Sequence, residues 1–216
     1  PDQQLVLDGV ASRLRSDSIR LTLDNFDISP LSALLGRWGY NIAGVTNGYA
    51  TVKSALSNPE IEAAISLDSL AVNGLKAPPQ DITSNWDFKD NRARVFIIER
   101  DRRDTVIRGY YQPQGNRYYA RASMQNMKLA LISPFLKDII SDIEGDADIE
   151  ARIVGEGRQA TLSGSATVDN IGATVDYTKV RYRAPKAELI IKDNHFIAER
   201  VPVSDMEGNR GSFSMD

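Results

Sequence analysis

The stretch Ala147-Asp148-Ile149-Glu150-Ala151-Arg152-Ile153 alternates apolar and polar side chains at every position. Successive side chains of a β-strand point to opposite faces of the sheet, so this pattern places the four apolar residues on one face and the charged residues on the other. An antiparallel sheet with one solvated face is typical of such a pattern. The stretch therefore predicts a β-strand with one apolar face.

The same alternation recurs along the chain, at residues 5–7, 19–23, 61–67, 160–168, 173–177 and 187–191. Turn-forming pairs separate several of these segments, at Asp90-Asn91, Gly115-Asn116 and Asp193-Asn194. Asn, Asp and Gly tolerate the positive φ angles of tight hairpin turns. We therefore predict an all-β fold, with a long antiparallel sheet as its main element.

Two segments, 30–38 and 134–141, break the alternation and predict short helices. Each follows a Ser-Pro pair, with serine at a plausible N-cap and proline at the first helical position. Leu31, Leu34 and Leu35 form the apolar stripe of the first. The stripe of the second consists of Phe135, Leu136, Ile139 and Ile140.

The two helical segments indicate an internal repeat. Ile28-Ser29-Pro30-Leu31 recurs as Ile132-Ser133-Pro134-Phe135, 104 positions later, and alternating strands follow each copy. A repeat of this kind favours a stacked β architecture in which one unit does not close its own core. We expect a first segment at 1–122 and a second at 123–216, together forming one continuous β structure.

The composition excludes several classes of site. The 216 residues include no cysteine, which rules out disulfides, thiolate metal sites and cysteine nucleophiles. The net charge is −3, and basic residues do not gather into a nucleic-acid footprint. No apolar run approaches the roughly 18 residues of a membrane helix, and no signal peptide is visible. The chain begins without methionine and ends within the pattern, so we expect it to be a piece of a longer protein.

Individual polar clusters predict no catalytic, metal or cofactor site. The acidic series Asp142, Glu144, Asp146, Asp148 and Glu150 lies along one strand face, where steps of about 6.6 Å spread the carboxylates too widely to surround one ion. The only histidine, His195, lies in a predicted turn without a nucleophile motif. We interpret the Arg100–Arg103 cluster as the solvent-exposed tip of a hairpin. The tyrosines at 110–111 and 118–119 predict an aromatic pair between neighbouring strands.

The chain resembles the TamB/AsmA-like envelope proteins, in the form found in Bacteroidetes. The resemblance rests on Leu23–Leu31, Ser57–Ile61, the run Val175–Tyr182, and a tail with Ile190-Ile191, Phe196, Val201-Pro202-Val203, Asp205 and Gly208-Asn209-Arg210-Gly211. It covers effectively the whole chain. The family's fold is a long curved sheet, folded over like a taco around an apolar groove.

The resemblance implies a non-enzymatic role in the periplasm, within an inner-membrane-anchored protein that conducts phospholipids between membranes or assists assembly of outer-membrane proteins. The expected partners are lipid acyl chains or unfolded outer-membrane protein strands, with no nucleic acid and no cofactor. The family's inner-membrane helix and extreme C-terminal region are absent from this sequence. Anchoring and contact with an outer-membrane barrel partner are therefore expected from other segments.

The apolar face is where we expect function. The predicted groove-lining residues are Ile61, Ile65, Leu67, Val95, Ile97, Ile149, Ile153, Leu162, Val168, Val175, Leu189 and Ile191. An uncovered apolar face of this extent would mark a ligand or partner site. The alternative is a structural or adhesive β-module, in which a second sheet seals the same face and no ligand binds.

Overall fold

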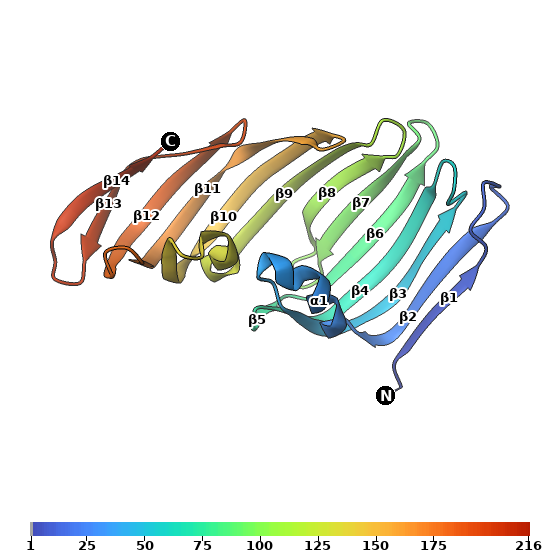
Figure 1. Ribbon diagram of the computed structural model, residues 1–216, viewed down its shortest axis with the longest axis horizontal. Helices are drawn as coiled ribbons and strands as arrows, with labels where there is room; N and C mark the ends of the chain where they lie inside the picture. The colour runs from blue at the N-terminus through green and yellow to red at the C-terminus, as the bar shows by residue number, and fades with distance from the viewer. Residues whose placement is uncertain (1) are drawn as a thin grey trace. The chain divides into compact units, whose positions relative to one another are not determined.

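The computed structural model describes residues 2–216, without the side chains of Trp38 and Phe135. In this part of the chain fourteen strands form one antiparallel open sheet, which confirms the predicted all-β fold (Figure 1). The strands are hydrogen-bonded in the order β1-β2-β3-β4-β6-β7-β8-β9-β10-β11-β12-β13-β14, and β5 pairs with β4. Contacts divide the residues into two compact units, each described by itself below.

Unit 1 comprises residues 2–120 together with Val154–Ala160. Its complete strands are β1 (Gln4–Gly9), β2 (Ser18–Asp27), β3 (Ile42–Lys53), β4 (Glu60–Val72), β5 (Leu75–Ala77), β6 (Gln80–Asp87), β7 (Arg92–Glu99) and β8 (Asp104–Gln112). Unit 2 comprises Arg121–Ile153 and Thr161–Asp216, with β12 (Val180–Lys192), β13 (His195–Asp205) and β14 (Arg210–Met215). The strands β9 (Arg117–Lys128), β10 (Ile140–Glu156) and β11 (Gln159–Val175) contribute residues to both units.

The register of unit 1 places its apolar side chains in rows across one face. One row runs through Leu5, Leu23, Gly48, Ile65, Ile82, Ile97 and Ile107. The next row runs through Leu7, Leu21, Ala50, Ala63, Ser84, Val95 and Gly109. Cross-strand pairs of this kind stabilise a sheet because each buries apolar area against its neighbour. The predicted turns also form, with positive φ at Asn91, Asn116, Asp193 and Asn194.

The first helical segment lies where it is predicted. It consists of η1 (Ser29–Leu31), α1 (Ser32–Leu35) and η2 (Gly36–Trp38). One detail of the prediction is wrong. No serine side chain caps the helix, because the hydroxyl of Ser29 hydrogen-bonds the carboxylate of Asp27 instead. Leu31 and Leu34 of the apolar stripe lie at the surface, where they are 42% and 68% exposed.

The second helical segment begins earlier than predicted. It is η3 (Leu129–Leu136), with Pro134 inside it, and β10 has already begun at Ile140. Ile139, predicted within the helical stripe, is 61% exposed. Leu129 is buried against Ala147 and Val168, with Ile132 packed beside them. Burial of these aliphatic side chains decides where the helix starts, whereas Ser133 only hydrogen-bonds the carbonyl of Ala130.

The internal repeat has a spacing of 101 positions, three fewer than the Ser-Pro motif indicates. In one copy the backbone N–H of Asn25 donates to Oδ1 of Asn47 at 2.8 Å. In the other, the N–H of Asn126 donates to Oδ1 of Asp148 at 2.9 Å. Both donors have positive φ in a strand that leads into a helix. Gly44 and Gly145 also share positive φ at this spacing, so a bulged strand followed by a helix is the repeated device.

The last residue of β7 is the most buried acid of unit 1. Glu99 is 5% exposed, and Arg102 binds it with Nε–Oε1 at 2.7 Å and Nη2–Oε2 at 2.9 Å. These hydrogen bonds hold the pKa of Glu99 below its ordinary value, although burial opposes them. Arg100 also pairs with Asp68, at 2.7 Å, so two arginines of the basic cluster are anchored to carboxylates.

Replacing Arg102 with alanine is expected to destabilise the protein by about 1–2 kcal/mol at neutral pH, since Glu99 keeps its charge and loses its partner. A carboxyl with a lowered pKa contributes stability above the pKa of the unfolded chain and loses it as the pH falls through the folded value. The penalty should therefore shrink as the pH is lowered through the ordinary range of glutamate. Urea unfolding at a series of pH values measures it. Arg103→Gln, one residue away, is the control, and an equal loss in both variants would contradict the assignment.

Candidate apolar groove

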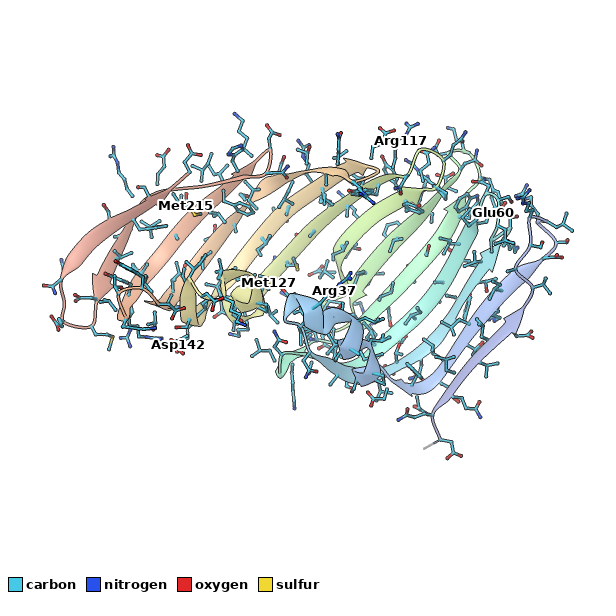
Figure 2. All side chains as sticks on the ribbon, viewed as in Figure 1. Arg37, Glu60, Arg117, Met127, Asp142 and Met215 are labelled. Carbon is cyan, nitrogen blue, oxygen red and sulfur yellow. The ribbon has the colours of Figure 1, made fainter. Side chains whose placement is uncertain are left out.

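Unit 2 contains an apolar groove, hereafter the unit 2 groove. It has a volume of about 620 Å³ and is lined by residues of β11, β12, β13 and β14, together with Ile140 of β10. Its apolar lining is Ile140, Val168, Ile171, Ala173, Val175, Tyr182, Ala184, Ala187, Leu189, Ala198, Val201, Val203, Phe213 and Met215. Met215 lies on β14 in Figure 2. Binding sites for small molecules fall in this range of volume and are predominantly apolar.

Strand register explains why these side chains meet. Val168 of β11 lies opposite Ala187 of β12, and Ala166 lies opposite Leu189. Val201 of β13 lies opposite Phe213 of β14, and Val203 lies opposite Gly211. Residues opposite one another in an antiparallel pair project to the same face. The apolar alternation of four strands therefore converges on one surface.

Irregular strand positions keep this face apolar along the strands. Asn170 has φ +54°, and both Val168 and Ile171 line the groove although three positions separate them. Their partners Ala187 and Ala184 keep the same register across Pro185, so the two strands change face together. A β-bulge at Arg200, with φ +48°, lets Ala198 and Val201 share the face. Without these irregular positions each strand would turn its apolar residues away from the groove beyond them.

The floor of the groove is packed, whereas its rim is exposed. Ala184, Ala198 and Val201 form a buried cluster, with Ile171, Ala187, Leu189 and Val203 packed against it. Phe213 and Met215 on β14 are 51% and 40% exposed although both line the groove. Polar lining is sparse and consists of Thr178, Arg183, Glu188 and Ser212. Such a surface can desolvate an apolar ligand but offers few directional contacts.

The predicted groove residues are divided between the two units. Val168, Val175 and Leu189 line the unit 2 groove. Ile149 packs against the cluster beneath η3 instead, so the helix fills that part of the face. Ile191 shares the face of Leu189 and is buried, and Ile153 and Leu162 are half-buried strand residues of the same unit. Ile61, Ile65, Leu67, Val95 and Ile97 lie on one face of unit 1 and are all half-buried.

Several lining residues escape the sequence pattern. Tyr182, Val201, Val203, Phe213 and Met215 all line the groove but do not belong to the predicted set. Their strands carry weak alternation, with Pro185 and Pro202 among charged residues. Tyr177, which continues the alternation of β11, lies in the following turn and is 96% exposed. Asn170 is the one sequence feature that indicates the irregular position in β11, since asparagine tolerates positive φ.

The polar clusters have structural partners. Lys128 binds Asp146, Arg121 binds Glu150, and Arg181 binds Glu144 at 2.7 Å. Asp142, labelled in Figure 2, accepts from Thr174. The rings of Tyr110 and Tyr119 stack with centroids 5.7 Å apart, which confirms the predicted cross-strand pair. His195 is the exposed first residue of β13. Within residues 2–216 no group of acidic or histidine side chains is arranged to hold a metal ion.

Comparison with known proteins finds no family model, no curated protein and no solved structure that matches the chain. None of the described helices is long and apolar enough to cross a membrane.

Proposed function

We propose that the chain is a periplasmic segment of a TamB/AsmA-like envelope protein, and that the unit 2 groove holds phospholipid acyl chains during transfer between membranes. The observation that carries this proposal is the groove itself, a volume of about 620 Å³ lined by apolar residues of five strands. Each methylene buried there contributes about 0.8 kcal/mol without a directional contact. The proposed role is binding and conduction, with no chemical step.

The absence of a covering layer supports an open groove over a sealed module. All described strands belong to one sheet, so neither unit contains a second sheet packed on its own apolar face. Of the twelve predicted lining residues, only Val168 and Ile191 are buried. A sealed sandwich would bury most of the inward side chains of both its sheets.

The backbone of the groove favours acyl chains over extended protein strands as the ligand. β12 and β13 are paired on both sides, so their N–H and C=O groups are occupied within the sheet. A peptide lying across the groove floor would bury its own backbone polar groups without partners, at about 1–3 kcal/mol for each. An acyl chain carries no such groups.

Lipid binding can be measured directly on the purified chain. We expect native mass spectrometry, after extraction from bacterial envelopes in mild detergent, to detect bound phospholipid. A fluorescent fatty-acid probe should bind, and phospholipid should displace it while soluble glycerol phosphate does not. A folded chain that carries no lipid and binds no probe would refute the proposal.

A further inference from the structure

The connections at one end of unit 1 carry exposed apolar residues that no strand pattern explains. Leu14 in the β1–β2 loop, Leu56 in the β3–β4 turn and Phe88 in the β6–β7 turn are 63%, 62% and 64% exposed. Val10, at the start of the same loop, is 60% exposed. Figure 1 shows these three connections at the same end of the strands of unit 1.

Hydrogen bonds and ion pairs hold the three connections together. The N–H of Leu56 donates to the carbonyl of Ser12 at 3.0 Å, and Oγ of Ser57 donates to the carbonyl of Arg13 at 3.2 Å. Arg15 pairs with Glu60 at 2.7 Å and lies over the ring of Phe88, with its guanidinium carbon 5.4 Å from the centroid. Figure 2 labels Glu60 at this end of the strands. The tips therefore form one anchored surface, hereafter the loop surface.

The loop surface carries unpaired positive charge. Its acids Glu60, Asp87 and Asp90 are all bound by arginines. Arg13, Lys53 and Lys89 are exposed and, among the residues described, make no ion pair. Asp17 is the remaining acid of these connections. Cations surrounding protruding aliphatic and aromatic side chains match the interface of an anionic membrane, where apolar groups enter the acyl boundary and Lys or Arg meets phosphate.

We propose that the loop surface docks unit 1 onto an anionic lipid bilayer, with Leu14, Leu56 and Phe88 inserted and Arg13, Lys53 and Lys89 against the phosphates. A bilayer fits better than a protein partner. The three apolar side chains project from separate turns, whereas a protein hot spot gathers its anchors in one packed pocket. A bilayer needs no matching pockets. This surface lies outside the proposed acyl-chain site.

Vesicle flotation of the full chain tests the docking. We expect binding to vesicles of phosphatidylcholine with phosphatidylglycerol, weakened by salt, and little binding to phosphatidylcholine alone. Leu14→Ser/Leu56→Ser should reduce binding about tenfold or more. Arg13→Gln/Lys89→Gln should reduce it about 30-fold, as expected for two cations at about 1 kcal/mol each.

Matched variants at other exposed sites of unit 1 distinguish docking through the loop surface from nonspecific adsorption to vesicles. Leu31→Ser/Leu34→Ser removes two exposed leucines of the helical segment, and Lys76→Gln/Arg103→Gln removes two exposed cations. Neither should change flotation. Loss of flotation in these controls to the same degree, equal binding to neutral vesicles, or no binding by the folded wild-type chain would overturn the proposal. Leu189→Glu should leave flotation intact, and the loop variants should keep fatty-acid binding, so each proposal fails on its own measurement.

Discussion

Replacement of Leu189 by glutamate is expected to weaken acyl-chain binding by about two orders of magnitude. Leu189 lines the unit 2 groove and packs against the cluster on its floor. A carboxylate there must either lose its hydration when an acyl chain enters or keep water in the groove. Both exclude the ligand, at a cost of about 2–3 kcal/mol. Titration with the fatty-acid probe measures the loss.

The neighbouring residue supplies the control. Ile190 lies on the same strand, points to the opposite face and is 55% exposed. Ile190→Glu should therefore bind the probe with wild-type affinity, and thermal unfolding should show that both variants are folded. Equal affinity of the two variants would exclude the groove as the lipid site. Ile149 is a poorer test position, because a charge there would disturb the packing beneath η3.

Substitution of Gly48 by alanine is expected to cost about 3 kcal/mol of stability or more. Gly48 lies in β3 with φ +134°, a region that residues with a side chain rarely adopt. An added Cβ would lie 2.1 Å from the carbonyl oxygen of Ala64 and 2.7 Å from Cα of Ile65. These are backbone atoms of the neighbouring strand, so relief requires the pairing of β3 with β4 to open. Urea unfolding gives the change in free energy.

Gly36→Ala is the matched substitution in the same unit. Gly36 has φ −59°, and an added Cβ meets nothing within 4 Å. Alanine should leave stability unchanged or raise it by up to about 1 kcal/mol, because the unfolded chain loses conformational freedom. If Gly48→Ala were as stable as Gly36→Ala, the close approach of β3 and β4 would be wrong.

Local pattern was enough to predict the strands, the hairpin turns and the face to which the apolar residues of unit 1 belong. Those features depend on period-two alternation and on Asn, Asp and Gly at turns, both of which are written within a few residues. The start of η3 was not predictable in the same way. It depends on Leu129 meeting Ala147 and Val168, which are distant in the chain.

The lining of the groove follows from the sequence only in part, because irregular strand positions decide which side chains share its face. Val168, Val175 and Leu189 follow simple alternation and lie in the lining. Phe213 and Met215 line the groove through the pairing of β14 with a strand that is itself bulged near Arg200. The Ser-Pro motif indicates the repeat, but its equivalent positions are set by Asn25 and Asn126, whose backbone N–H groups make the same hydrogen bond to a side chain of the next strand.

The sparse polar lining of the unit 2 groove has a kinetic consequence. Few donors or acceptors are present to fix a bound chain at one position along the strands. As such a chain advances by one methylene, it leaves one aliphatic contact and gains another of similar strength. Its free energy then changes little from step to step, and the barriers to sliding stay low. Under the proposed function, a lining of this kind favours movement of the acyl chain along the groove over its retention at one place.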